Sequence, residues 1–314
     1  MTYTTKKRIK GKSYLYLIES VRLPDGSIKK ISKLIKSKKE KENYKTFLEM
    51  KKRELFINFA LQNYQFKCPI TKEDVKKIEE IRLDYKKIIS SLSKAQLKDL
   101  FDRFTVNFTY ESNAIEGNSL TLKDVAIVLF EKQSIKGKDL RELYETRNSR
   151  KAMDLLLLKK IKITHESIIN LHKVLMKDID VRQGYKKIPN FILGSNLKTS
   201  SPEKTYSDMT NLIRWYDEQK ETLHPIILIS VFHGRFLKIH PFEDGNGRVA
   251  RFLLNAMLID RGYPPLIIRK TSKVKYLNCL RAFDKGSDIN LMRFILEKFK
   301  RTFHNFFEVY VKYL

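Results

Sequence analysis

The stretch HPFEDGNGRVAR, residues 240–251, is the part of this 314-residue chain that most narrows its fold. The apolar run 225–239 precedes it and residues 246–261 continue with helical spacing, so the stretch predicts a tight turn between two helices. Gly245 and Gly247 stand at the entrance of the second helix, where glycines let backbone N–H groups converge on an anion. The helix dipole adds its positive end there, so the turn predicts an anion-binding site.

The charged side chains of the same stretch fit a phosphate ligand. Arg248 and Arg251 are three positions apart, so on a helix they share a face and can donate to further phosphates. Asp244 can hold a Mg²⁺ ion that bridges phosphate oxygens. His240 stands at the mouth of the turn, where it can accept a proton from an attacking hydroxyl. Together these groups predict phosphoryl or nucleotidyl transfer.

These twelve residues resemble the signature of the Fic family, H-x-F-x-[DE]-G-N-G-R-x-x-R, at every fixed position. The resemblance implies a protein adenylyltransferase, an enzyme that moves AMP from Mg-ATP to a Ser, Thr or Tyr hydroxyl of a target protein. By the resemblance, His240 is the general base, Phe242 points into the core and Asp244 binds Mg²⁺. The implied phosphate contacts come from an anion hole and two arginines: Gly245, Asn246, Gly247, Arg248 and Arg251.

Residues 275–286, KYLNCLRAFDKG, resemble the Fic segment that packs on the adenine of ATP. The resemblance implies that Tyr276 stacks on the base and that Asp284 reaches the purine edge. The plainer interpretation of a helical Tyr is core packing, and it stays open for Tyr276.

Residues 182–203 are rich in turn formers and match the position of the Fic flap, a hairpin that holds the target peptide as an added strand. Gly184 and Tyr185 resemble the start of the flap, although Lys186 stands where the family usually has Arg. The residues that we expect at the target-docking groove are Tyr185, Ile192 and Leu193. The alternative is a plain surface loop.

Residues 112–118, SNAIEGN, resemble the Fic inhibitory motif, [ST]-x-x-x-E-[GN]. The resemblance implies that Glu116, four residues after Ser112, pairs with Arg251 and prevents correct placement of the γ-phosphate. It also leaves open a role for Glu116 in removing AMP from modified proteins. The plainer interpretation is a helix end at which Gly117 is the left-handed cap and Glu116 is solvated.

Leu, Ile, Lys and Glu dominate the composition, whereas Gly and Pro number only 11 and 8, which favours helices. Residues 13–35 are the exception, because alternating apolar positions flank the turn formers 24–27 and predict a β-hairpin. We therefore expect a mostly α protein, with a Fic-type helical domain and a short β-hairpin flap, preceded by a small basic hairpin and helix module. The expected domains are the basic module 1–60, a helical region 61–135 that carries the inhibitory helix, and the catalytic domain with C-terminal helices 136–314.

Helical spacing and capping residues predict the remaining elements. The predicted helices are 38–60, 71–91, 93–115, one that begins at 121, 139–160, 165–177, 206–220, 225–239, 246–261, 271–283 and 290–313.

The chain carries a formal net charge of +27, and its first sixty residues hold 17 Lys or Arg against 6 Asp or Glu. A basic excess attracts nucleotides, nucleic acid or acidic membrane surfaces, although scattered lysines equally describe a solvated surface. Cys68 and Cys279 match neither a metal-binding spacing nor a disulfide framework, which favours a reducing compartment. Because neither an apolar leader nor an apolar run of membrane-spanning length is visible, we expect a cytoplasmic protein without a membrane partner.

Two alternatives to adenylyl transfer remain open. The same motif could transfer another group, namely UMP, phosphocholine or phosphate, or the chain could be a nucleic-acid-associated regulator with an idle Fic core. The expected ligands are ATP and Mg²⁺, and the expected partner is a target protein with an accessible hydroxyl, the chain itself included. A homodimer stays open, as does nucleic acid at the basic N-terminal module, which we favour less.

Overall fold

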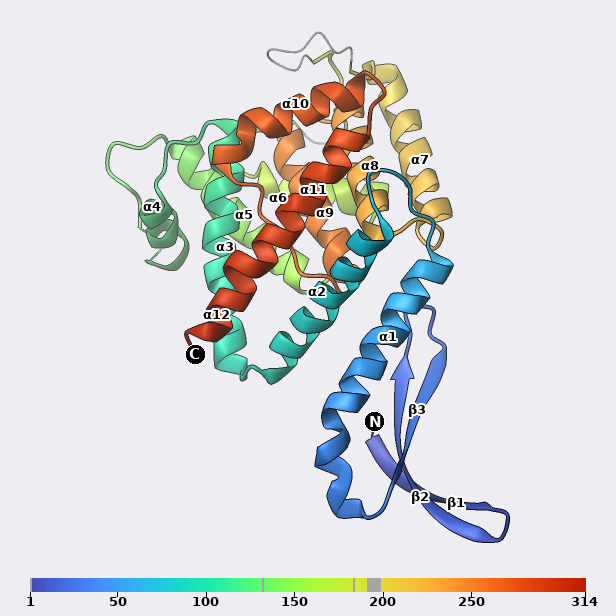
Figure 1. Cartoon of the computed structure of the whole chain (residues 1–314). Helices are drawn as coiled ribbons and strands as arrows, with labels where there is room; N and C mark the ends of the chain where they lie inside the picture. Colours follow the sequence, from blue (N-terminus) through green and yellow to red (C-terminus); the bar gives the residue numbers. More distant parts are fainter. Residues whose placement is uncertain (1, 132, 183, 191–198) are drawn as a thin grey trace. The chain divides into compact units, whose positions relative to one another are not determined.

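The computed structural model describes residues 2–131, 133–182, 184–190 and 199–314, and the chain falls into two units (Figure 1). Unit 1 comprises Met1–Gln65 with Lys72–Leu83, and unit 2 comprises Phe66–Thr71 with Asp84–Leu314. Among the helices of these described ranges, none combines the length and the apolar character that crossing a membrane requires.

Unit 1 contains an antiparallel sheet of three strands in the order β1-β2-β3. The strands are β1 (Thr2–Ile9), β2 (Lys12–Arg22) and β3 (Ile28–Ile35). The predicted hairpin is confirmed as β2 and β3, joined by a turn in which Gly26 has a φ of 83° and the Leu23 N–H donates to Ser27 O at 2.8 Å. The sequence does not predict β1, because its residues TYTTKKRI lack a regular apolar alternation.

One face of this sheet packs on a helix. Leu17, Val21, Ile31 and Ile35 share that face by register, and all four are buried. The chain continues into a 3₁₀ helix η1 (Lys38–Tyr44) and then α1 (Lys45–Asn63), so the helix predicted at 38–60 begins with a tighter turn than expected. The next helix, α2 (Lys72–Ser91), starts in unit 1 and ends in unit 2.

Unit 2 is helical in the residues that the structure describes. Its elements are α3 (Lys94–Glu116), α4 (Leu122–Ala126), the π-helical η2 (Ile127–Glu131), α5 (Leu140–Leu157), α6 (His165–Leu175), α7 (Pro202–Gln219), α8 (Pro225–Ile239), α9 (Asn246–Asp260), the 3₁₀ helix η3 (Lys270–Ser272), α10 (Lys273–Asp284), α11 (Ile289–Thr302), the π-helical η4 (Phe303–Phe307) and α12 (Glu308–Lys312). The predicted mostly α architecture is confirmed.

The antiparallel pair α8 and α9 lies at the centre of unit 2, with α5, α6, α7, α10 and α11 packed around it (Figure 1). Both helices are buried on nearly all sides, which matches their almost continuous apolar sequences. Because the two helices are fixed on every side, the loop that joins them has a rigid base.

Capping residues set several of the helix starts. Ser93 and Thr121 form capping boxes at the starts of α3 and α4, where the sequence predicts that two helices begin. The helix α7 begins at Pro202, four residues before the expected position 206, because proline favours the first helical turn. The predicted flap includes residues 191–198, which lie outside the described residues, and so do Ile192 and Leu193.

Candidate active site

The loop between α8 and α9 is held in one shape by its own side chains. His240 ends α8 with a φ of 53°, and Gly245 precedes α9 with a φ of 78°, so a left-handed residue stands at each end of the loop. The Asn246 side chain accepts from the Phe242 N–H at 2.9 Å and donates to the Phe242 carbonyl at 2.6 Å. Phe242 is fully buried against the His172 ring, 3.8 Å between centroids. The amide of Asn246 therefore braces the loop, which leaves the backbone at the start of α9 as the candidate anion hole.

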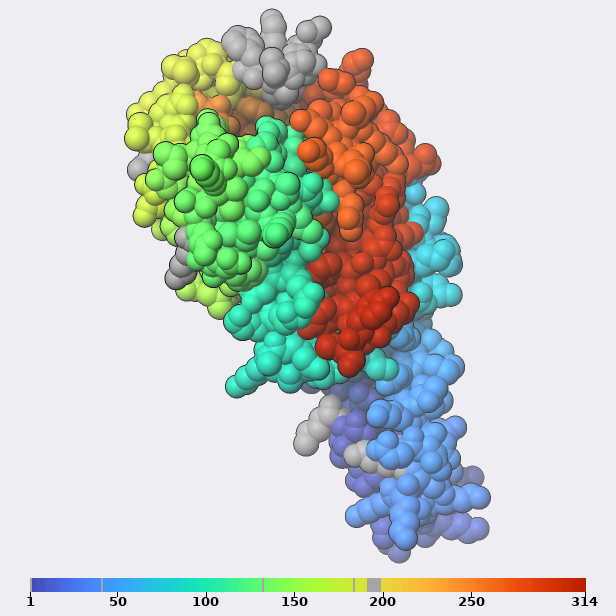
Figure 2. Space-filling model, turned by 90° about the vertical axis from the view of Figure 1, so that its left-hand side faces the viewer, coloured from blue at the N-terminus to red at the C-terminus, as the bar shows by residue number. Residues whose placement is uncertain are grey.

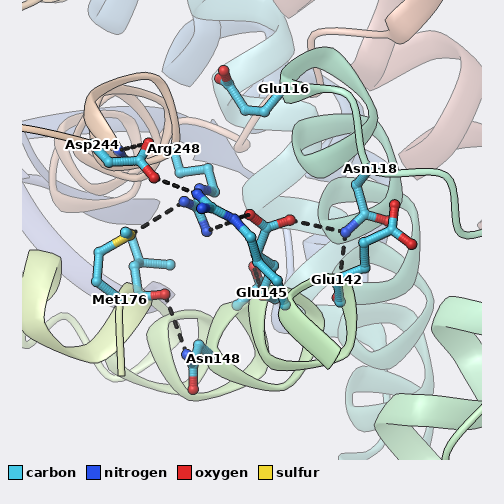
Figure 3. A network of polar contacts seen from close by, with 12 residues as sticks. Glu116, Asn118, Glu142, Glu145, Asn148, Met176, Asp244 and Arg248 are labelled. Carbon is cyan, nitrogen blue, oxygen red and sulfur yellow. Dashed lines mark hydrogen bonds and ion pairs between the residues drawn. The ribbon is translucent and has the colours of Figure 1, made fainter. Parts of the chain in front are cut away.

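Arg248 lies in the first turn of α9 with only 2% of its surface exposed. Its Nη2 donates to Met176 Sδ at 3.2 Å, and its Nη1 lies 3.5 Å from Glu145 Oε1, so the guanidinium is enclosed between these two side chains (Figure 3). Within the described ranges, Arg248 Nε and Nη1 have no hydrogen-bond partner. A buried cation with unsatisfied N–H groups beside a cavity is suited to an anionic ligand.

Arg251, one turn further along α9, is engaged by the end of α3. Its Nη2 donates to Glu116 Oε1 at 2.7 Å and to the Ser112 carbonyl at 2.9 Å, and its Nε donates to Ser112 Oγ at 2.9 Å. A Cβ atom on Gly247 would collide with the Glu116 carboxylate and would lie 3.1 Å from Arg251 Nη1. The glycine at 247 is therefore what lets α3 bring a carboxylate onto the entrance of α9.

Asp244 carries the carboxylate that the sequence assigns to a metal. Burial alone would raise its pKa, but Arg248, the Gly245 N–H and Arg141 together hold the pKa of Asp244 below its ordinary value. Asp244 Oδ2 accepts a short hydrogen bond from Arg141 Nη2. The side chain is thus ionised at neutral pH and paired with a cation that a metal ion would have to replace.

His240 stands beside the loop as a neutral imidazole. Burial lowers the pKa of His240 below its usual value, and the nearby Lys186 ammonium lowers it further. Its Nδ1 lies 3.3 Å from the Leu237 carbonyl. A ring that donates its Nδ1–H to a carbonyl has an unprotonated Nε2, which is the form that a general base needs.

A cavity of about 700 Å³ brings these groups together. It is bounded by the ends of α3 and α8, the start of α5, the loop with the start of α9, and α10. Figure 2 shows the outer side of this region, where the teal-to-green part of unit 2 lies beside the orange part that contains α10. The sequence-predicted residues that line the cavity are Glu116, His240, Asp244, Gly245, Asn246, Gly247, Arg248, Arg251, Tyr276 and Asp284.

The two residues predicted to bind the base lie on the α10 side of the cavity. Tyr276 is 2% exposed, its hydroxyl contacts His233 Nε2 at 2.6 Å and its ring stacks on Phe294. Burial raises the pKa of the Tyr276 hydroxyl, so it stays protonated. Asp284 is half-buried at the end of α10, and burial raises its pKa. These contacts fit the core-packing interpretation of Tyr276, which also lines the cavity.

The described part of the flap contacts the base of the loop. Tyr185 is half-buried, its hydroxyl lies 2.8 Å from His165 Nδ1 and its ring packs on Phe242. Lys186 is 4% exposed and donates from Nζ to Asn190 Oδ1 at 2.8 Å and to the Ile239 carbonyl at 3.3 Å. Both side chains make contacts at the start of the flap, and the docking role of Tyr185 stays a prediction.

Sequence reasoning misses four residues that complete the site. Arg141 pairs with Asp244, His172 Nε2 lies 3.1 Å from the Asp244 carbonyl, and Glu145 and Met176 enclose Arg248 (Figure 3). Glu145 also accepts from Asn118 Nδ2 at 2.9 Å, which connects the chain after α3 to the arginine. The sequence feature that could have identified Arg141 and Glu145 is their spacing, because residues four apart on a helix such as α5 share a face.

Comparisons with known proteins agree with this geometry. Residues 162–258 match the Fic/DOC family model. The protein adenylyltransferase Fic of Drosophila erecta is 33% identical over 197 residues, and that of Drosophila melanogaster is 32% identical over the same length. Each alignment covers 62% of this chain and 40% of the relative, so the chain spans about 40% of the length of these curated relatives.

Solved structures share the fold. A Fic-domain-containing signaling protein from Bacteroides thetaiotaomicron is 28% identical with a TM-score of 0.67, covering 75% of this chain and 97% of that one. Fic-1 from C. elegans has a TM-score of 0.66 at 22% identity, covering 84% and 75% of the two chains, which shows a common fold. The segment that matches the Fic/DOC family model, residues 162–258, contains the whole loop at 240–251.

Proposed function

We propose that this chain transfers AMP from ATP to a hydroxyl group of a protein. The observation that carries the proposal is that one cavity holds a neutral imidazole, a helix start and a buried arginine, Arg248, whose Nε and Nη1 have no hydrogen-bond partner among the described residues. The relatives named as adenylyltransferases support the same chemistry.

Each group has a defined part in this reaction. Nε2 of His240 accepts the proton of the incoming hydroxyl as its oxygen forms a bond to the α-phosphorus of ATP. The bond from that phosphorus to the β-phosphate oxygen breaks, and pyrophosphate leaves. Backbone N–H groups at the start of α9, with Arg248, hold the negatively charged phosphates throughout. The rigid loop contributes by keeping the base and the phosphate in line.

The cavity offers one carboxylate, that of Asp244, to a magnesium ion. No group of three or more His, Cys, Asp or Glu side chains with metal-binding geometry occurs in the described portion of the chain. Mg²⁺ does not require one, because it commonly binds one carboxylate together with substrate phosphates and water. Asp244, ionised and lining the cavity, is the residue that would hold it, and the ion would supply charge neutralisation at the phosphates.

We further propose that Glu116 restrains the reaction. Its carboxylate occupies Arg251 Nη2 at 2.7 Å, which removes a donor for the outer phosphate and places a negative charge where that phosphate would lie. ATP could then bind only with its phosphates displaced from the line of attack. A role of Glu116 in AMP removal stays part of the same proposal, because a carboxylate beside the phosphate site can also orient water.

Intact mass spectrometry after incubation with Mg-ATP tests the transfer. We expect the wild-type chain, or its Glu116→Gly variant if the restraint is strong, to gain the mass of AMP on itself. The gain should disappear in His240→Ala, which lacks the base. The gain of a single phosphate would identify a kinase-like reaction instead. A gain of AMP that is unchanged in His240→Ala would exclude this imidazole as the base.

A further inference from the structure

The hairpin formed by β1 and β2 in unit 1 extends past the third strand. The pairing of β2 with β3 stops at Leu15, opposite Ile35, whereas the pairing of β1 with β2 continues to Ile9 opposite Lys12. Residues 7–14 therefore form a two-stranded ribbon beyond the end of β3, closed by a turn at Lys10 and Gly11 with φ values of 49° and 77° (Figure 1).

This ribbon is positively charged along its whole length. No Asp or Glu occurs in residues 1–18. The first acidic residue, Glu19, lies on the other face of the sheet, where its carboxylate is 3.7 Å from Lys52 of α1. The exposed cations in the ribbon, and in the residue directly before it, are Lys6, Lys7, Arg8, Lys10 and Lys12.

The sheet face opposite α1 continues the charge of the ribbon. By register, Tyr16, Arg22 and Lys30 point to this face, and both cations are exposed. Tyr16 is half-buried, with the Lys7 ammonium 5.1 Å from its ring centroid. None of the in-register positions on this face is a carboxylate. A face with cations, aromatic rings and no acidic side chain is complementary to a polyanion.

The geometry points to duplex DNA as the occupant of this ribbon and sheet face. The major groove of B-form DNA is wide enough for a two-stranded β-ribbon, whereas the major groove of an A-form RNA duplex is too narrow. The ribbon would enter the groove, and its Lys and Arg side chains would neutralise phosphates on both sides. The site lies wholly in unit 1, whereas the proposed phosphate-binding loop, residues 240–251, belongs to unit 2.

Fluorescence anisotropy with a labelled 20-base-pair DNA duplex tests this inference on the full chain over a series of salt concentrations. The test variant is Lys7→Gln, Arg8→Gln, Lys12→Gln, which leaves the turn residues unchanged. The matched control is Lys38→Gln, Lys39→Gln, Lys45→Gln, which removes the same charge from exposed residues of η1 and α1. Each variant is checked by circular dichroism, so that loss of fold is not mistaken for loss of binding.

We expect wild type and the control to bind the duplex, and the ribbon variant to bind about tenfold or more weakly, with the slope of log K against log salt reduced by about 2 to 3. His240→Ala should bind like wild type. Equal weakening in both triple variants would overturn the inference, because general charge would then explain the binding. Tighter binding to a single strand or an RNA duplex, or binding only to vesicles that contain phosphatidylserine, would also overturn it.

Discussion

At the scale of single residues, the charge state of His240 depends on Lys186, a residue that departs from the Fic pattern. Lys186 stands where Arg is usual, and burial lowers its pKa to about 8. Its ammonium donates hydrogen bonds to Asn190 Oδ1 and to the carbonyl of Ile239, and Ile239 directly precedes His240. At pH values near 6.5 Lys186 is protonated. Its positive charge beside the imidazole disfavours protonation of His240.

We predict that Lys186→Met raises the pKa of His240. The sign follows because removing a nearby cation makes protonation of the imidazole less unfavourable, and the remaining burial still keeps the pKa low. NMR titration of the His240 ring measures the shift directly, and in activity assays the acid limb of the rate profile should move to higher pH. The control is Lys187→Met, at an exposed neighbour, which should leave the titration unchanged. An equal or opposite shift in the two variants would show that Lys186 does not act on His240.

The residues of the loop itself could be predicted from the sequence, because they are contiguous and each type has a distinct chemical use. The engagement of Asn246 could not, since an amide that braces the Phe242 backbone and one that binds phosphate look the same in a sequence. Arg141 and Met176 could not be predicted either. They reach the loop from α5 and from the end of α6, and only the folded structure brings those segments together.

At the scale of elements, α3 ends at Glu116, and this last residue lines the cavity. Gly117 ends the helix with a φ of 109°, a conformation that side chains other than glycine rarely adopt. Directly after it, Asn118 donates to Glu145 on α5 and the Ser119 N–H donates to Glu142 at 2.5 Å. The helix before Glu116 and these contacts after it fix its backbone at a position from which the carboxylate reaches Arg251.

We predict that Glu116→Ala increases incorporation of AMP from α-labelled ATP, because it frees Arg251 for the outer phosphate. The matched control is Glu243→Ala, which removes another carboxylate that lines the same cavity but pairs with Arg182 and contacts neither Arg251 nor the segment after α3. Quantitative autoradiography of both proteins, with thermal melts to confirm folding, provides the comparison. The restraint would be refuted if the two variants labelled equally, or if Glu116→Ala labelled no more than wild type.

Element types and most helix starts could be predicted, since caps such as Ser93 and Thr121 and the apolar spacing are local signals. The strand β1 could not. Its residues have little apolar face of their own, and they become a strand because β2 offers a free edge to pair with. The lack of carboxylates in β1 is a separate feature, and it is what makes the ribbon complementary to a polyanion.

At the scale of the whole molecule, two anion-binding surfaces belong to two different units. The proposed phosphate-binding loop, residues 240–251, lies in unit 2 between α8 and α9. The basic ribbon, residues 7–14, lies in unit 1. The chain crosses between the units at 65/66, at 71/72 and within α2 at 83/84, and α2 is the one helix that contributes residues to both by these bounds. A ligand stabilises only those segments that unfold together with its site.

This division predicts a selective response to ATP in hydrogen exchange followed by mass spectrometry. At a concentration of about 100 times Kd, Mg-ATP should stabilise the folded state of unit 2 by about 2.7 kcal/mol, which slows exchange about 100-fold in segments that open only with the site. Peptides from α8 and α9 should show this protection, whereas peptides from β2 and β3 should not. The DNA duplex should give the reverse pattern, with protection in residues 2–22. If ATP protected β2 as strongly as α9, the two units would unfold as one, and α2 would transmit stability between them rather than merely connect them.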